Sequence, residues 1–152
     1  IEEKNKPQFL RQTAIVLGVT VGPLFGKLHN GEEVEVDGNI IKPEQVLGEP
    51  KKSRKIVYSG DTLPCNDMIE FAKNSDLLIH ESTYTLEDED KAKENFHTTS
   101  ADASRIASAA NVNKLILTHF STRYNNTSDL ISQARLEFEK CDLAYDLMVV
   151  KL

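Results

Sequence analysis

The sequence predicts an α/β domain built on a sheet of parallel strands. The main evidence is three short stretches with apolar residues at their centre, at residues 55–59, 77–79 and 115–117. The last two runs are apolar at every position, a pattern typical of strands that are covered on both faces. Segments with helical periodicity separate the runs, and an alternation of strands and helices is typical of layered α/β folds.

Three helices are expected after the first of these strands. Residues 64–73 combine a proline in the first turn with spaced apolar side chains. Thr99, with Asp102 three residues later, resembles a capping box that begins a second helix. The third helix, over 128–140, has an apolar face formed by Leu130, Ile131, Ala134 and Phe138.

The remaining segments carry weaker patterns. The expected elements are a short helix over 7–17, defined turns over 18–31, a hairpin of 34–36 with 40–41, a loop over 43–50, a solvated helix start at 87–90, and a terminal hairpin of 143–145 with 147–152.

Composition narrows the class of protein. The chain has 152 residues, enough for one domain with a core. Its formal net charge of -6 does not favour a nucleic-acid partner but leaves one possible, because a local basic patch can bind phosphates on an acidic protein. Cys65 and Cys141 are isolated, which argues against a thiolate zinc site and a disulfide scaffold. The isolated cysteines lead us to expect a reduced, cytoplasmic protein. No apolar run approaches the roughly 20 residues of a membrane helix. The polar start at Ile1 indicates a piece of a longer polypeptide.

Each predicted strand ends in residues suited to metal or acid–base chemistry. Asp61 follows the first strand, His80 to Thr83 follow the second, and His119 follows the third. Imidazole and carboxylate groups suit zinc, and two zinc ions can activate water for phosphodiester cleavage. Taken singly, Asp61 is better explained as a helix cap and a histidine as a hydrogen-bonded residue. The convergence of three strand ends favours a site.

Further candidates lie in loops. His97 lies in a loop that enters a helix, where backbone N–H groups favour a phosphate, although a surface histidine is the alternative. Arg123 could hold a phosphate bidentately or pair with a carboxylate. His29 receives no role. Lys51, Lys52, Arg54 and Lys55 form the one dense basic cluster, which is most simply a solvated turn.

These motifs together carry a resemblance to a known family. Ser59–Thr62, His80–Thr83, His97–Thr99 and Leu117–Tyr124 resemble in order and spacing the C-terminal motifs of ribonuclease Z. That family consists of endonucleases of the metallo-β-lactamase fold that mature the 3′ end of tRNA. In addition, Gly22 to Leu28 resembles the glycine-proline segment of the family's tRNA-binding arm.

The resemblance implies a fold and an activity. Residues 1–152 would be the C-terminal half of a metallo-β-lactamase-like αβ/βα sandwich, with about 7–37 in the tRNA-binding arm (the exosite). The activity would be zinc-dependent removal of the 3′ trailer from precursor tRNA, which leaves a 3′-hydroxyl on the tRNA. The family also implies a homodimer and two Zn²⁺ ions in each complete active site.

The resemblance also implies roles for single residues. Asp61 would bridge the two zinc ions and His119 would be a terminal ligand, while His97 and Glu81 would be catalytic. The expected substrate contacts are Arg123, His80, Thr83, Thr98, Gly22 and Pro23. Two positions depart slightly from the family, because Ser82 and Thr98 stand where it has alanine and serine.

One departure is larger. The family's His-x-His-x-Asp-His motif and a further histidine are missing, so this chain carries only two of the expected metal ligands. We therefore expect the missing N-terminal half to supply the others, and this piece alone to bind zinc weakly and to cut no RNA. The alternatives are another hydrolase or phosphodiesterase of the same fold acting on a small ester, and a non-catalytic tRNA-binding fragment.

Overall fold

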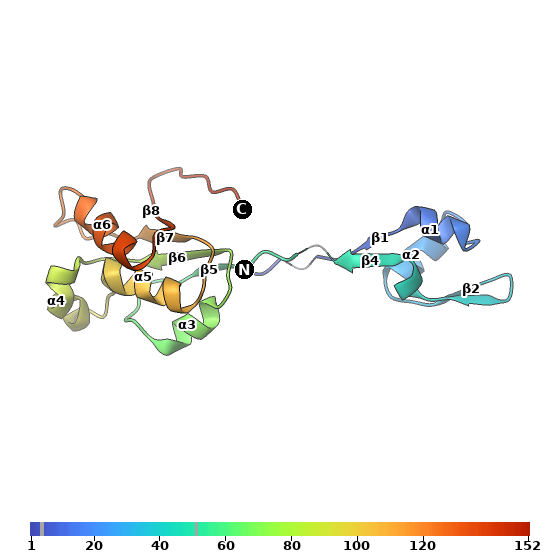
Figure 1. Cartoon of the computed structure of the whole chain (residues 1–152), viewed down its shortest axis with the longest axis horizontal. Coiled ribbons are helices and arrows are strands. Elements are labelled where there is room, and N and C mark those ends of the chain that lie inside the picture. The colour runs from blue at the N-terminus through green and yellow to red at the C-terminus, as the bar shows by residue number, and fades with distance from the viewer. Residues whose placement is uncertain (4, 51) are drawn as a thin grey trace. The chain divides into compact units, whose positions relative to one another are not determined.

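A computed structural model describes residues 1–3, 5–50 and 52–152; Lys4 and Lys51, the latter part of the predicted basic turn, lie outside it. The chain divides into two compact units (Figure 1). The larger unit combines Ile1–Glu2 with Arg54–Leu152, and the smaller unit spans Glu3–Ser53. Each unit is described by itself.

The larger unit is built on a parallel sheet in the order β5-β6-β7-β8. The strands are β5 (Ile56–Tyr58), β6 (Leu77–Glu81), β7 (Leu115–Thr118) and β8 (Cys141–Leu143). The first three were predicted from the apolar runs. Because all four strands are parallel, their carboxyl ends share one edge of the sheet. The polar residues that follow the strands therefore meet at that edge.

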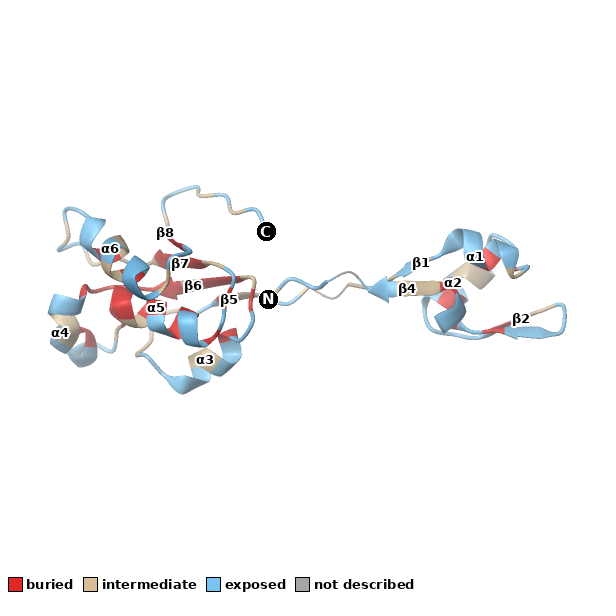
Figure 2. Ribbon diagram, in the orientation of Figure 1, coloured by how far each residue is buried: buried red, intermediate tan, exposed pale blue. Residues whose placement is uncertain are grey.

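Helices cover one face of this sheet (Figures 1 and 2). They are α3 (Asn66–Ala72), α5 (Ser100–Ala109) and α6 (Ser128–Glu137), while η2 (Leu86–Asp88) and α4 (Glu89–Glu94) lie between β6 and α5. Their alanines pack against the inward side chains of the strands, and the buried core residues include Val57, Leu78, Leu115, Leu117, Ala103, Ala107 and Ala134. The small alanine side chains let helices approach the sheet closely.

The predicted helix signals act as expected. The Thr99 hydroxyl accepts a hydrogen bond of 3.1 Å from the backbone N–H of Asp102 at the start of α5. In α6, Leu130 and Ala134 are fully buried, which confirms the predicted inner face. The acidic run does begin a helix, since η2 leads directly into α4.

The opposite face of the sheet is less completely covered. Ile79 and Ile116 lie on it, and the C-terminal segment 144–150 passes against them around a hollow of about 290 Å³. Tyr58, which pairs with Ile79 in the sheet register, is 64% exposed. The predicted terminal hairpin is wrong: β8 joins the sheet in parallel to β7, and no strand follows it among the described residues.

The smaller unit has its own apolar core. Two antiparallel pairs frame it: β1 (Pro7–Phe9) with β4 (Leu47–Pro50), and β2 (Val34–Val36) with β3 (Asn39–Ile41). The other elements are α1 (Arg11–Val16), α2 (Pro23–His29) and η1 (Pro43–Gln45). The core side chains are Ala14, Val19, Leu28, Val34, Ile41 and Val46. The hairpin prediction is confirmed, and Gly38 at its turn has φ +78°, which favours glycine.

Three predictions for this unit need correction. The expected helix over 7–17 begins only at Arg11, because Pro7–Phe9 pair with β4 instead. The expected loop over 43–50 contains that partner strand, whose pairing no local pattern reveals. The turns expected over 18–31 enclose α2, which Pro23 begins at its first position, where a missing N–H costs nothing. No helix in the described part of the chain has the length and apolar character to cross a bilayer.

Candidate metal centre

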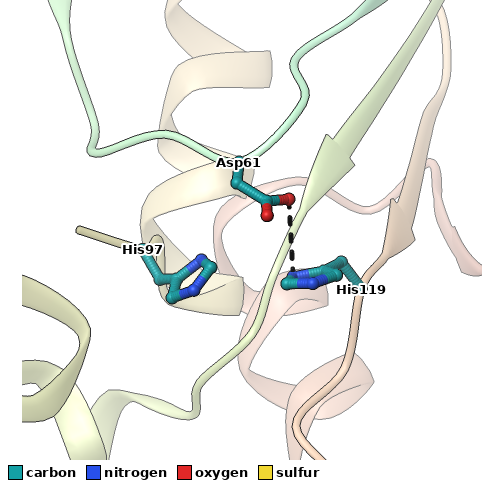
Figure 3. A group of neighbouring side chains, drawn as sticks. All are labelled: Asp61, His97 and His119. Atoms are coloured by element: carbon teal, nitrogen blue, oxygen red, sulfur yellow. Dashed lines mark ion pairs between the residues drawn. The ribbon is translucent and has the colours of Figure 1, made fainter. Parts of the chain in front are cut away.

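Three side chains from separate loops meet at the carboxyl edge of the sheet in the larger unit (Figure 3). Asp61, His97 and His119 each offer one possible ligand atom, and these atoms lie within 4.8 Å of one another. Asp61 Oδ1 lies 3.6 Å from His119 Nδ1, and the two imidazole rings have centroids 5.2 Å apart. Imidazole nitrogen and carboxylate oxygen are donors that zinc accepts, so this set fits a metal ion.

The backbone delivers two of these side chains through left-handed conformations. Gly60, with φ +62°, turns the chain after β5 so that Asp61 follows directly. His119 itself has φ +57°, which lies in the left-handed region. Residues with a Cβ atom adopt this region only at a cost in free energy. Non-glycine residues held in this region cluster at functional sites, where surrounding structure fixes them. The positive φ of His119 therefore supports a functional role for the residues at the end of β7.

Glu81 lies behind the metal-type group as a buried, ionised carboxylate. It is 1% exposed, and its two oxygens accept four hydrogen bonds. Burial alone would raise the pKa of this carboxyl group, but the hydrogen bonds from Thr83, Thr62 and His97 outweigh burial and lower it. The group is therefore an anion and a hydrogen-bond acceptor at neutral pH.

His97 is hydrogen-bonded directly to this carboxylate. Its Nδ1 atom lies 2.9 Å from Glu81 Oε1, and its ring is partly exposed beside His119. Phe96, the residue before it, has φ +59° and ends the turn after α4. The carboxylate thus orients the imidazole ring, an arrangement that suits a histidine for proton transfer.

His80, although next to Glu81 in the chain, is oriented differently. It points to the helix-covered face, because β6 alternates its side chains and His80 pairs in register with buried Leu117. The ring is fully buried, and Nδ1 donates a hydrogen bond of 2.7 Å to the Glu81 backbone carbonyl. Burial lowers the pKa of His80 and outweighs the opposing hydrogen bond and charge of Glu81. A substrate contact, as the resemblance implies, would need this ring to leave the core.

Two predicted substrate-contact residues have hydroxyl groups that are already engaged within the protein. Thr98 is fully buried and donates its hydroxyl to the backbone carbonyl of Thr62, which ties the His97 loop to the Asp61 loop. Thr83 is 6% exposed, and its hydroxyl lies between Glu81, His97 and His119. Both residues thus connect the loops of the site.

Arg123 lies beside the site, on an aromatic platform. Its guanidinium carbon lies 4.8 Å from the centre of the Tyr84 ring, and Nη1 lies 3.4 Å from Asp88 Oδ2. Asp88 also accepts a hydrogen bond of 2.7 Å from the Tyr124 hydroxyl, and hydrogen bonds from Lys91 and Tyr124 lower its pKa to about 2. The guanidinium therefore has a fixed position and remains partly exposed.

The sequence interpretation missed some residues of this region. Asp88 belongs to an acidic run that was interpreted only as a solvated helix start, and no local signal distinguishes it from its neighbours. His97 was predicted as a catalytic residue, and its donor atom also lies within 4.8 Å of those of the two predicted ligands. The predicted contacts Gly22 and Pro23 lie in the smaller unit, where they open α2.

Comparison with known proteins places the chain in a family. A family model described as a β-lactamase superfamily domain matches residues 29–120. The chain belongs to this superfamily. The metallo-β-lactamase fold predicted from the motifs is confirmed by a solved superfamily structure, the metallo-β-lactamase fold protein YhfI from Bacillus subtilis. It matches with a TM-score of 0.56 and 28% identity over 60% of this chain and 37% of YhfI.

Within the superfamily, the resemblance to ribonuclease Z is also confirmed. The chain is 51% identical over 151 residues to a protein named ribonuclease Z from Methanothermobacter thermautotrophicus. That match covers 99% of this chain and 49% of the relative, so the chain spans about half the length of the curated relatives it matches. The long form of RNase Z from yeast matches with a TM-score of 0.57 and 35% identity over 64% of this chain and 13% of the yeast chain.

Proposed function

We propose that the protein containing this chain is a zinc-dependent endoribonuclease of the ribonuclease Z type, which removes the 3′ trailer from precursor tRNA. The observation that carries the proposal is the convergence of Asp61, His97 and His119 in front of the buried Glu81 carboxylate. Relatives named ribonuclease Z that align with nearly the whole chain add support.

Asp61 and His119 are the residues that would hold zinc in this chain. When bound, zinc would supply Lewis acidity that activates water and offsets the charge that develops on the phosphate. Two ions per complete site need more ligands than this chain offers, so a segment outside the chain would contribute the rest. The less covered face of the sheet, with Ile79 and Ile116, is where we place that missing half.

His97 and Glu81 would move the proton that the reaction requires. Hydrolysis adds water to the phosphorus and breaks its bond to the 3′ oxygen of the tRNA. Protonated His97 gives that oxygen a proton, which yields the 3′-hydroxyl on the tRNA and a 5′-phosphate on the trailer. Glu81 stabilises the positive charge on His97 through the Nδ1–H hydrogen bond and leaves Nε2 directed away from the carboxylate.

Arg123 would bind a substrate phosphate next to the reacting one. Its guanidinium is stacked on Tyr84, with Nη1 near Asp88 and Nε donating a hydrogen bond of 3.2 Å to the Ser121 hydroxyl, and it remains partly exposed. Arginine presents several donors in a rigid fork, which suits phosphate oxygens. The ion pair and the stacking reduce the rotamer entropy that phosphate binding would otherwise cost.

The segment of about 7–37 would grip the body of the tRNA. It belongs to a unit with its own core, and it presents exposed cations such as Arg11 and Lys27. Gly22 and Pro23 begin α2 at its surface. A homodimer and a cytoplasmic location belong to the same proposal, by analogy with the family.

The structure offers a clean way to test the arm. Glu2 bridges to Lys55, and the backbone N–H of Ile56 donates a hydrogen bond of 2.8 Å to the Ile1 carbonyl, so the chain leaves and re-enters the larger unit side by side. Residues 4–52 of the complete protein can therefore be replaced by a short glycine-rich turn. A matched variant keeps the unit but carries Arg11→Ala and Lys27→Ala.

The assay compares zinc-loaded proteins on precursor tRNA and on a small phosphodiester. We expect the excision to lower kcat/KM for precursor tRNA by roughly tenfold or more, and the double variant to lower it less, with small-substrate hydrolysis unchanged. Equal loss on both substrates would make the unit structural. Absence of precursor-tRNA cleavage by the intact protein would overturn the proposed function, and cleavage of the small ester alone would favour a different hydrolase.

A further inference from the structure

The hydroxyl group of Thr83 joins the parts of the site. Thr83 Oγ1 lies 2.7 Å from Glu81 Oε2, 2.8 Å from His119 Nδ1 and 3.2 Å from His97 Nδ1. The side chain is 6% exposed, so these protein atoms rather than solvent surround the hydroxyl. A single oxygen thus contacts the carboxylate and both histidines of the candidate centre.

Counting protons fixes the direction of each hydrogen bond. The backbone N–H groups of Thr62 and Thr83 and the Thr83 hydroxyl all donate to the Glu81 carboxylate, which in its ionised form can only accept. The Thr83 hydroxyl has one proton, and at 2.7 Å it gives that proton to Glu81. Its remaining lone pairs can only accept, so His119 Nδ1 at 2.8 Å must carry a proton and donate it to Thr83.

We propose that Thr83 is a positioning residue that fixes His119 as the Nδ1–H tautomer and so leaves Nε2 as the ring atom with a lone pair for the metal. Asp61 Oδ1 is the other group near His119 Nδ1, but 3.6 Å is longer than a hydrogen bond. Metal-binding histidines generally donate the other ring N–H to a partner that sets tautomer and ring orientation. Here the partner is a hydroxyl whose own proton a buried anion holds in place.

The same pattern links the metal ligand to the acid–base group. His97 Nδ1 lies 2.9 Å from Glu81 Oε1, and that acceptor is ionised, so His97 also carries its proton on Nδ1. Glu81 therefore orients His97 directly and His119 through Thr83. This inference rests on the proposed function only for the identity of the metal site. It gives Thr83 a positioning role, while the substrate contact that the resemblance implied for Thr83 stays a prediction.

The test is ¹⁵N NMR of the metal-free complete protein labelled at histidine, at about pH 8, where ordinary imidazoles of pKa ~6.5 are neutral. The resonances of His119 are assigned by comparison with the His119→Gln variant. Protonated and unprotonated ring nitrogens have distinct ¹⁵N shifts. We expect wild-type His119 to carry its proton on Nδ1, and a proton on Nε2 would overturn the proposal.

Two substitutions of Thr83 separate its hydroxyl from its shape. Thr83→Val keeps the volume and removes the hydrogen bonds, whereas Thr83→Ser keeps the hydroxyl. We expect the valine variant to lose the Nδ1–H signature and to bind zinc about 10–100-fold more weakly, the usual range for an outer-shell partner. The serine variant should retain both properties.

The outcomes separate this proposal from the proposed function. An unchanged His119 tautomer in Thr83→Val, or serine failing to preserve it, would overturn the positioning role. If Thr83→Val does not fold, the wild-type and Thr83→Ser spectra still decide. If the protein shows the expected tautomer and zinc response but does not cut precursor tRNA, the positioning role of Thr83 is supported and the nuclease proposal is wrong.

Discussion

The two units bury different kinds of side chain. In the smaller unit, the buried side chains of the described residues are apolar, such as Leu28 and Val46. In the larger unit, His80, Glu81 and Thr98 are buried as completely as the leucines around them. Burial of polar groups costs free energy unless hydrogen bonds compensate, so a fold keeps them where their positions matter. The difference supports the proposal that the chemistry takes place in the larger unit, whereas the tRNA contacts proposed for the smaller unit would come from its surface.

The strongest way to sharpen this comparison is to remove the acid–base group of the larger unit. We expect His97→Ala in the complete protein to lower the cleavage rate by about 10²–10⁴-fold, the usual contribution of proton transfer by a side chain. Zinc content, measured by atomic absorption, should not change. If zinc is lost with the ring, His97 is a third ligand, as its place within 4.8 Å of the other donors allows.

A matched pair of core leucines tests whether the units depend on each other. Leu117 lies in the core of the larger unit and Leu28 in that of the smaller unit, and both are fully buried. Each change to alanine should cost about 2–5 kcal/mol of unfolding free energy, through lost burial and a cavity. Denaturation combined with zinc titration should show weaker zinc binding only for Leu117→Ala. Equal weakening by Leu28→Ala would contradict the separation of roles.

A smaller effect should appear in the pH dependence of stability. Because burial lowers the pKa of His80, the unfolded state takes up a proton below about pH 6.5 while the folded state does not. The contribution of His80 to the free energy of unfolding is therefore fully present above that pH. It falls as the pH drops toward the pKa of His80 in the folded state, by at most about 1.4 kcal/mol per pH unit.

The substitution that checks this sign is His80→Asn, which keeps a donor for the Glu81 carbonyl and does not titrate. Urea denaturation between pH 7 and 5 should show a flatter profile for the variant than for the wild type. If the stability of the variant falls with pH as steeply as that of the wild type, another group, and not the buried imidazole, causes the acid sensitivity.

Sequence patterns predicted the larger unit well because its signals are local. The runs at Leu77–Ile79 and Leu115–Leu117 are strands, and the Thr99 cap begins its helix as expected. The smaller unit was predicted less well, since β1 and β4 are short strands that pair across about 40 residues of intervening chain, as the register of Phe9 with Leu47 demonstrates. Such pairing depends on contacts that propensity does not encode.

The candidate site divides in a similar way. Asp61, His97 and His119 could be named because strand ends and helix entries have recognisable sequences, and the structure brings them together. The buried placement of His80 could not be predicted, because it depends on which face of β6 its side chain takes, and that of Thr83 depends on the loops that meet around it after β6 ends at Glu81. Their assignment as substrate contacts remains a prediction, one that buried side chains make hard to satisfy. The pairing of Asp88 with Arg123 also needed the fold.

The most direct test of the account is the zinc content and precursor-tRNA cleavage of Asp61→Ala in the complete protein. Asp67→Ala, which removes an exposed carboxylate in the first turn of α3, is the matched control. The account predicts that Asp61→Ala loses zinc and cleaves no precursor tRNA, while Asp67→Ala retains both properties. An Asp61→Ala protein with wild-type zinc content and cleavage would contradict the assignment of the metal centre to this edge of the sheet.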